Sequence, residues 1–399
     1  VIFLANSDST EGGEEKYDSE LLVEGSISVL GTEAEPVTFT SSETTPTRGD
    51  WGGIRLKQDG VFEYAVLEYS GYGVYSYEAN LTFKNSKVNY SGSYGLRGRN
   101  RYKTVLIEGS EITGTQHHAI YFEGAWQNTT GSFTMRDSEI KDSNGSVYLA
   151  EPSEVLIEGN EIANNSQSEF YVRDLWGSVT VKNNTFSNNK SGHLNIQGGH
   201  NDGNNPQSLS VLVEGNSITD GSSSSTSGIT VGSMKKGTGI LIKDNVINNR
   251  YHGVEVYDYY NNDAKILGNT IKGTQQQSTG ISVSGKTKST IENNTIENKQ
   301  NGIRVEYNDA NGDGSSTIKG NVVKGNSGYG IRVENYAKPL ISLNDIENNN
   351  GYFVDNQTAF TVDARNNWWG ATLKAVIESG DNPRALDKFY DQYDDSTKG

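Results

Sequence analysis

A small polar residue, usually Asn, recurs two places before an apolar residue, at intervals of about 22 to 32 residues. The repeat is clearest in seven tripeptides: Ser138-Glu139-Ile140, Asn160-Glu161-Ile162, Asn184-Thr185-Phe186, Asn216-Ser217-Ile218, Asn245-Val246-Ile247, Asn269-Thr270-Ile271 and Asn294-Thr295-Ile296. Self-similarity at such a period indicates stacked repeats. We interpret the Asn as a turn residue, because Asn tolerates left-handed φ and can hydrogen-bond to backbone and to a stacked Asn.

Two short strands are predicted in each repeat. One has the form Gly-Ile-x-Val, as at 253–256, and the other precedes the Asn, as at 211–214. Both alternate apolar and polar residues with period two, as half-buried strands do. We therefore predict an all-β parallel solenoid of about twelve coils over residues 1–370. Residues 371–399 are predicted to form a C-terminal cap segment with an acidic tail.

Composition and charge narrow the protein class. The chain has 46 Gly but 6 Pro in 399 residues, which suits many tight turns. No apolar run approaches the ~20 residues of a membrane helix, so membrane insertion is not expected. The net charge of −16 argues against nucleic acid. It suits an extracellular or cell-surface protein, or one that binds Ca²⁺.

The two ends of the chain carry further motifs. Near the start stand Gly31-Thr32, Pro36–Ser41 and Asp50-Trp51-Gly52-Gly53-Ile54, and near the end stands Asn366-Asn367-Trp368-Trp369-Gly370. With the repeat, these motifs resemble the right-handed parallel β-helix proteins of the pectin-lyase-like superfamily, of the secreted or surface bacterial and archaeal type. The resemblance implies a right-handed solenoid and leaves function open, because this scaffold carries many activities.

The resemblance also frames expectations for the termini. An apolar cap strand usually follows Trp-Trp-Gly in that superfamily. Here residues 371–377 predict a short helix and no closing strand. Val1-Ile2-Phe3-Leu4 predicts a buried strand, which suggests that the domain began earlier in a longer precursor.

The outward residues of the Gly-Ile-x-Val strands are candidates for ligand binding. They are Tyr75, Tyr77, Arg97, Arg99, Tyr121, Tyr148, Tyr171 and Arg173. Successive strands lie ~4.8 Å apart, close to the length of one sugar unit. Aromatic faces and planar hydrogen-bonding groups suit sugar rings and uronate carboxylates. The alternative is a tyrosine ladder that only stabilises the sheet.

The strand before the Asn has a contrasting outward column. Its charges alternate in sign along Lys84, Glu108, Arg136, Glu158, Lys182, Glu214 and Lys243. Opposite charges on neighbouring strands stabilise a sheet modestly. We predict that this second column is structural.

A catalytic site would use the densest titratable cluster, His117-His118 with Tyr121, Glu123 and Trp126. With Arg97, the residues His118, Tyr121 and Glu123 could supply base, acid and neutraliser for β-elimination on a uronic-acid polymer. Glu123 and Glu151 could alternatively serve hydrolysis. The chain lacks the Gly-His-Gly motif of polygalacturonases and the Arg-x-Pro-x-x-Arg motif of pectate lyases, so we favour a protein that is not an enzyme.

The segment Asp309-Ala310-Asn311-Gly312-Asp313-Gly314 matches the first half of a Ca²⁺ loop. Asp309, Asn311 and Asp313 would be the ligands. Gly320 stands where the closing Glu is expected, and a metal-free turn is the alternative.

Three functional hypotheses follow. The leading one is an extracellular or cell-surface structural or adhesive module that contacts a polysaccharide, such as a cell-wall or matrix glycan, through the Tyr/Arg residues. The second is a polysaccharide lyase or glycoside hydrolase on the same residues. The third is a filament subunit, because solenoid ends that lack a cap expose strand edges that favour end-to-end self-association.

Overall fold

The structure is a computed structural model. It describes residues 1–8, 17–99, 103–124, 131–166, 170–190, 194–198, 209–219, 226–234, 236–260, 262–273, 278–380 and 385–398. Trp126 of the catalytic hypothesis lies outside the described residues. The chain divides into two compact units, residues 1–205 and residues 206–399, which are described separately below.

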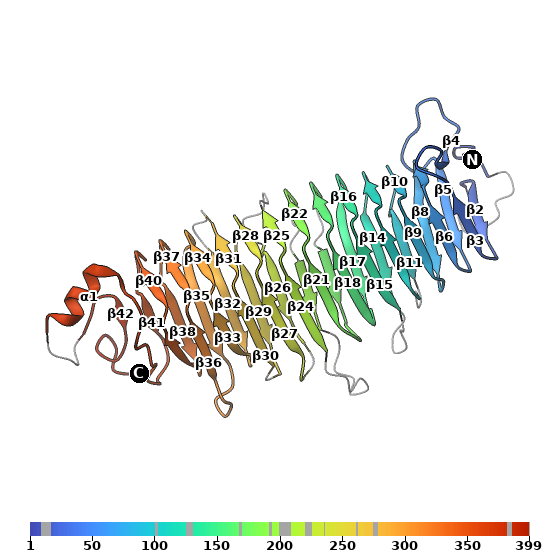
Figure 1. Cartoon of the computed structure of the whole chain (residues 1–399). Helices are drawn as coiled ribbons and strands as arrows, with labels where there is room; N and C mark the ends of the chain where they lie inside the picture. The colour runs from blue at the N-terminus through green and yellow to red at the C-terminus, as the bar shows by residue number, and fades with distance from the viewer. Residues whose placement is uncertain are drawn as a thin grey trace. The chain divides into compact units, whose positions relative to one another are not determined.

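In unit 1 every third strand pairs in parallel, which builds three sheets (Figure 1). The first sheet has the order β1 (Ile2–Phe3), β4 (Val37–Ser41), β7 (Ala65–Glu68), β10 (Lys87–Asn89), β13 (Glu111–Thr113), β16 (Glu139–Lys141), β19 (Glu161–Ala163) and β22 (Thr185–Ser187). The second has the order β2 (Glu20–Val23), β5 (Trp51–Leu56), β8 (Ser70–Tyr77), β11 (Leu96–Arg99), β14 (His118–Glu123), β17 (Gly145–Ala150), β20 (Phe170–Arg173) and β23 (Leu194–Gln197). The third has the order β3 (Ile27–Leu30), β6 (Gly60–Glu63), β9 (Leu81–Lys84), β12 (Val105–Glu108), β15 (Ser132–Arg136), β18 (Glu154–Glu158) and β21 (Val179–Lys182).

Unit 2 repeats this arrangement. Its first sheet has the order β25 (Ser217–Thr219), β28 (Val246–Asn248), β31 (Thr270–Lys272), β34 (Thr295–Glu297), β37 (Val322–Lys324) and β40 (Asp345–Glu347). The second has the order β26 (Ile229–Gly232), β29 (Val254–Asp258), β32 (Thr279–Gly285), β35 (Asn301–Tyr307), β38 (Ile331–Asn335), β41 (Val354–Asn356) and β42 (Phe389–Tyr390). The third has the order β24 (Ser210–Glu214), β27 (Gly239–Lys243), β30 (Asp263–Leu267), β33 (Lys288–Glu292), β36 (Ser315–Lys319) and β39 (Lys338–Ser342).

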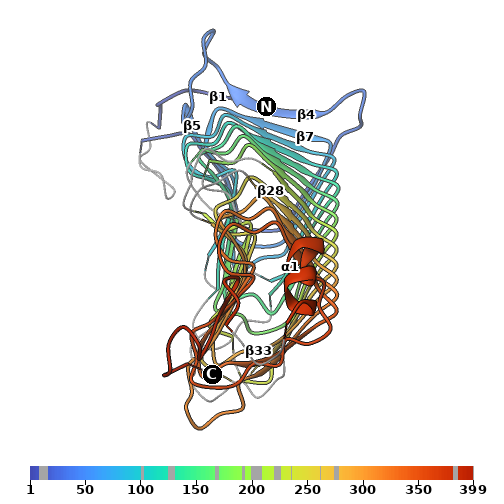
Figure 2. The ribbon, with the colours of Figure 1, turned by 90° about the vertical axis from the view of Figure 1, so that its left-hand side faces the viewer.

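This arrangement confirms the predicted parallel solenoid. Figure 2 shows the successive coils within each unit lying over one another, as strict parallel pairing requires. The described part of the chain makes about eleven turns, against the twelve predicted.

The core is formed by the inward residues of each coil, which stack in register. In unit 1, Val74, Leu96, Ile120 and Val147 pair in succession and are fully buried. Each such side chain contributes ~1.5–3 kcal/mol through burial. Because every coil presents the same face inward, the period-two pattern of the sequence specifies the register.

The Asn repeat forms a buried ladder, but its conformation differs from the prediction. In unit 2, Asn216 donates through Nδ2 to Oδ1 of Asn245 at 3.0 Å, and Asn245 donates to Asn269 at 2.9 Å. Left-handed φ belongs to the preceding residue, for example Asp244 at 56° and Asn293 at 55°. The ladder Asn is therefore selected for its side-chain hydrogen bonds rather than for its φ.

The termini correct two further expectations. β1 is paired with β4, but Ile2 and Leu4 are 72% and 64% exposed, so the first strand is not buried. Only Phe3 of this segment packs on an aromatic ring, stacking on Trp51 at 4.0 Å. The predicted helix is α1 (Gly370–Glu378), which contacts β40 (Figure 1). The expectation of no closing strand was wrong, because β42 pairs in parallel with β41.

Candidate ligand-binding face

The structure aligns the predicted outward column on the second sheet of unit 1. Tyr75 pairs with Arg97, Arg97 with Tyr121, Tyr121 with Tyr148, and Tyr148 with Tyr171. We call the eight predicted ligand-binding residues the Tyr/Arg face: Tyr75, Tyr77, Arg97, Arg99, Tyr121, Tyr148, Tyr171 and Arg173. Their side chains leave β8, β11, β14, β17 and β20 on the side opposite the apolar core.

The tyrosines of the central strands contact one another ring to ring. Tyr121 and Tyr148 stack with centroids 4.6 Å apart and an interplanar angle of 7°. Tyr148 and Tyr171 meet edge to face at 5.8 Å. These geometries are the favoured ones for aromatic pairs and stabilise each pair by ~0.5–1.5 kcal/mol. The stacking therefore holds the rings in fixed positions along the face.

Two tyrosines that were not predicted from the sequence extend the stacked rings of the Tyr/Arg face into an aromatic cluster. Tyr72 and Tyr94 stack at 6.0 Å, and Tyr94 lies 4.9 Å from Tyr121. Each stands directly before the Gly of a Gly-x-x-x strand, as His118 stands before Ala119. Reading one position upstream of the Gly would have identified this third column.

Arg97 lies at the centre of the aromatic cluster. Its guanidinium carbon is 4.9 to 6.0 Å from the ring centroids of Tyr72, Tyr75, Tyr94 and Tyr121. Nη1 of Arg97 also donates to the Tyr72 hydroxyl at 3.2 Å. The guanidinium therefore links the rings by cation–π contacts.

The N-terminal end of the face is closed to a ligand. Tyr75 is only 9% exposed. Arg55, one strand earlier, is buried and pairs with Glu20 at 2.6 Å. The accessible tyrosines of the column are the half-buried Tyr121, Tyr148 and Tyr171.

The neighbouring column is more exposed and more charged. Tyr77 is 37% exposed, and its ring centroid lies 5.4 Å from Nζ of Lys57. Arg99 pairs with Glu123 at 3.8 Å, and Arg173 pairs with Asp174 at 2.5 Å. Both pairs are partly exposed to solvent, so their arginines can exchange partners at modest cost.

The structure brings three of the four catalytic candidates, Arg97, His118 and Tyr121, together around the Tyr94 ring. His118 lies 6.2 Å from Tyr94 and 5.6 Å from Tyr121, measured between ring centroids. Burial, and then the neighbouring His117, lowers the pKa of His118 to about 4, so its imidazole is neutral at pH 7. Burial, and then the hydrogen bond to Glu123, raises the pKa of Tyr121. A neutral imidazole can accept a proton, whereas Tyr121 resists losing one.

Glu151, the partner of Glu123 in the hydrolytic hypothesis, also lies in this unit. Burial, and then the charge of Asp174, raises the pKa of Glu151. A raised carboxyl pKa is a property of general acids, but it also follows from burial alone.

In unit 2 the second sheet carries a different outward surface. Arg304 donates to Glu334 at 2.5 Å and to Glu306 at 2.6 Å. Arg332 lies 2.7 Å from Glu334 through Nε. These ion pairs occupy the column that holds tyrosines in unit 1, so the aromatic face is a property of unit 1.

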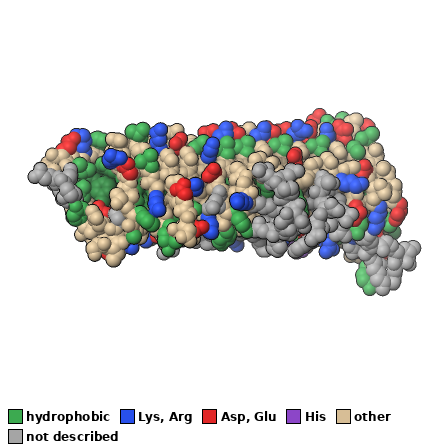
Figure 3. Space-filling model, turned by 90° about the horizontal axis from the view of Figure 1, so that it is seen from below, with side chains coloured by type: hydrophobic (Ala, Val, Ile, Leu, Met, Phe, Trp, Pro, Cys, Tyr) green, Lys and Arg blue, Asp and Glu red, His purple; other side chains and the backbone are tan. Residues whose placement is uncertain are grey.

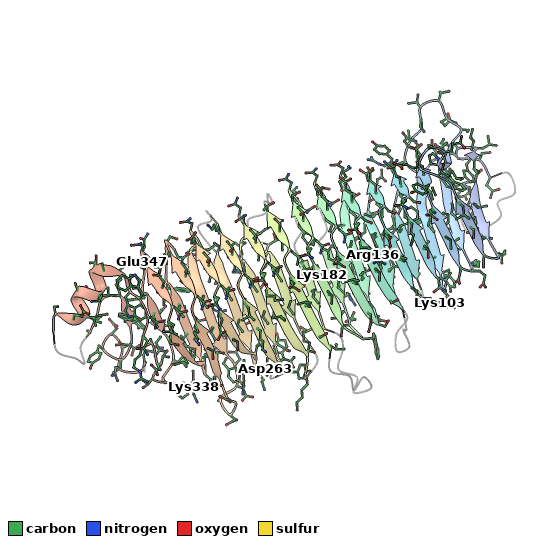
Figure 4. The ribbon with its side chains drawn as sticks, viewed as in Figure 1. Lys103, Arg136, Lys182, Asp263, Lys338 and Glu347 are labelled. Carbon is green, nitrogen blue, oxygen red and sulfur yellow. The ribbon has the colours of Figure 1, made fainter. Side chains whose placement is uncertain are left out.

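The sign-alternating column is confirmed on the third sheet. Glu108 pairs with Arg136 at 3.0 Å, and Glu158 pairs with Lys182 at 2.9 Å. Arg136 and Lys182 extend from neighbouring parts of this sheet in Figure 4. Seen from below in Figure 3, the described part of the surface also carries interspersed basic and acidic side chains. The register of the strands explains this surface, as predicted.

The predicted Ca²⁺ ligands are engaged by lysines. Asp309 pairs with Lys286 at 2.9 Å and Asp313 pairs with Lys288 at 2.7 Å. The hydrogen bond from Lys288 lowers the pKa of Asp313 to about 2. Among the described residues, no group of three His, Cys, Asp or Glu side chains is placed to hold a metal ion. Calcium binding stays a prediction, and it would require both carboxylates to leave their lysines.

Comparison with known proteins agrees with this architecture. Residues 123–275 and 258–380 match the family model described as the right-handed beta helix region. The chain belongs to the right-handed β-helix family. Residues 27–193 of this β-helix also match the model of NosD, described as a periplasmic copper-binding protein. No curated protein and no solved structure matches the chain.

No helix in the described ranges has both the length and the apolar character needed to cross a membrane.

Proposed function

We propose that this β-helix is a periplasmic or cell-surface structural or adhesive module that binds a polysaccharide through the Tyr/Arg face. The match to NosD, a periplasmic family by its description, supports the location. The single observation that carries the binding proposal is the fixed row of half-buried tyrosines at Tyr121, Tyr148 and Tyr171.

The row suits an extended glycan. Its tyrosines stand on successive strands, ~4.8 Å apart, so consecutive sugar units can meet consecutive rings. The stacked rings lose little conformational freedom on binding, because they are already ordered. Arg99 and Arg173 flank the row and can turn from Glu123 and Asp174 to a uronate carboxylate.

The test is binding of acidic and neutral polysaccharides by calorimetry, with the double substitution Tyr121→Ala/Tyr148→Ala. We expect at least a ten-fold loss of affinity, because each lost sugar–ring contact removes apolar area that is buried on binding and reduces shape complementarity. Tyr336→Ala is the control, since Tyr336 is an exposed tyrosine (41%) of unit 2 and is not one of the residues of the face. Undiminished binding by the double variant would remove the face from consideration.

The lyase or hydrolase hypothesis shares this face and is tested in the same samples. His118, Tyr121, Glu123 and Arg97 are its candidates, and the clustering of His118 with Tyr121 is the observation that favours it. Unsaturated products or new reducing ends that disappear with His118→Gln would establish catalysis. Intact polysaccharide after long incubation supports a binding role.

A further inference from the structure

A shallow groove of about 390 Å³ crosses the third sheet of unit 2, on strands β30, β33, β36 and β39. Two outward columns line it. Asp263, Lys288, Ser315 and Lys338 form one column, and Lys265, Thr290, Thr317 and Leu340 form the other. Asp263 and Lys338 mark its first and last strands in Figure 4.

The groove exists because short side chains lie between long ones. Thr290, Ser315 and Thr317 occupy its middle, while Lys265 and Leu340 stand at its two ends. The hydroxyl side chains leave space above the sheet that the flanking side chains do not fill. The groove therefore results from the residues that the sequence places on four consecutive coils.

The charge of the groove is opposite to that of the protein. Three lysines and one aspartate line it, in a chain of net charge −16. The matching positions in unit 1 are occupied by Ser132, Glu154 and Ser178, none of which is a lysine. A locally basic groove in so acidic a chain favours binding of an anionic ligand.

The three lysines of the groove form only weak interactions with other side chains of the protein. Lys265 is exposed and forms no ion pair with a described residue. Lys288 pairs with Asp313, which is 64% exposed, and Lys338 lies 4.2 Å from the Phe360 ring centroid. Exposed ion pairs contribute ~0–1 kcal/mol, so Lys288 can turn toward a ligand at little cost.

The chemistry of these groups selects the kind of anion. A lysine ammonium is a compact point charge that suits phosphate oxygens, whereas planar bidentate pairing with carboxylates is the property of arginine. The neighbouring Thr290, Thr317 and Ser315 add hydroxyl donors and acceptors for phosphate or sugar oxygens. Leu340, 46% exposed, offers apolar surface to a sugar ring.

The spacing selects a sparsely charged polymer. Lys288 and Lys338 share a column two strands apart, which corresponds to ~10 Å, near the length of a disaccharide. Double-stranded DNA carries one charge per ~1.7 Å of axis, and the net charge of −16 would repel so dense a polyanion. We propose that this groove binds a polysaccharide that carries phosphate groups, with Lys265, Lys288 and Lys338 contacting the phosphates.

The test uses a phosphomannan oligosaccharide and the same oligosaccharide after phosphatase treatment, titrated into the full chain by calorimetry. We expect binding of the phosphorylated form that weakens at least ten-fold in Lys288→Gln/Lys338→Gln. We also expect at least ten-fold weaker binding of the dephosphorylated form. Affinity for the phosphorylated form should fall as salt is raised, since the groups are exposed.

Matched variants keep the result interpretable. Lys182→Gln/Lys243→Gln makes the same change in net charge in the ion-paired column of the third sheet and should bind normally. The difference in affinity between the phosphorylated and dephosphorylated probes is assigned to the groove and should be lost in Lys288→Gln/Lys338→Gln. Loss of binding to unphosphorylated glycans in Tyr121→Ala/Tyr148→Ala reports on the Tyr/Arg face alone, so failure of the face and failure of the groove are distinguishable. No binding of the phosphorylated probe, equal binding of both forms, or equal loss in the control pair would overturn the proposal. Tighter binding of a uronate oligosaccharide or of single-stranded DNA that is lost in Lys288→Gln/Lys338→Gln would also overturn it.

Discussion

At the scale of single residues, Asn245 illustrates how a polar side chain can sit in the core of this fold. It is fully buried and donates through Nδ2 to the carbonyl oxygens of Val213 and Lys243, each at 3.0 Å. It also accepts hydrogen bonds from Asn216 and donates to Asn269. One amide thus joins three consecutive coils, because Asn offers both donors and an acceptor.

Replacing Asn245 should lower the free energy of unfolding in proportion to the hydrogen bonds that are lost. We expect Asn245→Ala to lower the free energy of unfolding by ~2–4 kcal/mol, since several buried groups lose partners at once. Asn245→Ser should cost less, because Ser86, Ser110 and Ser138 fill the same ladder in unit 1. Urea unfolding measures both, and equal losses for Ala and Ser would contradict the ladder.

The lowered pKa of His118 predicts how the free energy of unfolding depends on pH. The pKa of His118 is about 4 in the folded chain and near 6.5 when solvated, so the unfolded chain binds more protons between these values. The free energy of unfolding should therefore fall as pH drops from 6.5 to 4. His118→Gln should reduce this fall by roughly 1–3 kcal/mol. Identical pH profiles for the two proteins would show that His118 is not held neutral.

At the scale of strands, Gly53 determines how β5 and β8 pair and thereby places Tyr72. The register between the two strands shifts at Gly53 and Ile54. Gly53 has φ of 109°, and a Cβ there would lie 1.8 Å from the Tyr72 carbonyl oxygen. Only glycine fits this position, since both the conformation and the space exclude a side chain.

We expect Gly53→Ala to destabilise unit 1 by more than ~2 kcal/mol, through backbone strain and a clash that no rotamer relieves. Gly25→Ala is the matched control, because nothing lies within 4 Å of its Cβ position. Thermal unfolding followed by circular dichroism compares the two. A Gly53→Ala protein as stable as Gly25→Ala would contradict the assigned pairing.

The loop at Asp309–Asp313 carries the calcium prediction. A Ca²⁺ site there requires that added Ca²⁺ raise the melting temperature and that Asp309→Asn abolish the rise. The carboxylates must exchange Lys286 and Lys288 for the ion, so any gain is reduced by the pairs lost. A melting temperature that is the same in Ca²⁺ and in chelator would contradict the site.

The sequence predicted strand alternation and register well, because one face of each strand must be buried. Tyr75, Arg97, Tyr121, Tyr148 and Tyr171 stand in the predicted column for that reason. Contacts between columns could not be predicted in the same way. That Arg97 lies among four rings depends on side-chain directions that spacing alone does not specify.

At the scale of the whole molecule, a solenoid lets each outward column change independently of the core. The second sheet carries stacked tyrosines in unit 1 and Arg–Glu pairs in unit 2. The third sheet carries alternating ion pairs in unit 1 and the lysine groove in unit 2. Because each coil contacts only its neighbours, these surfaces can be altered by substitution without altering the fold.

We propose above that polysaccharide binds at the Tyr/Arg face. Hydroxyl-radical footprinting of the full chain, with and without a polysaccharide that binds it, tests this claim residue by residue. We predict protection of Tyr77, Tyr121, Tyr148 and Tyr171, while Tyr259, 66% exposed in unit 2, stays equally reactive. Unchanged reactivity of the four face tyrosines in the saturated complex would contradict it.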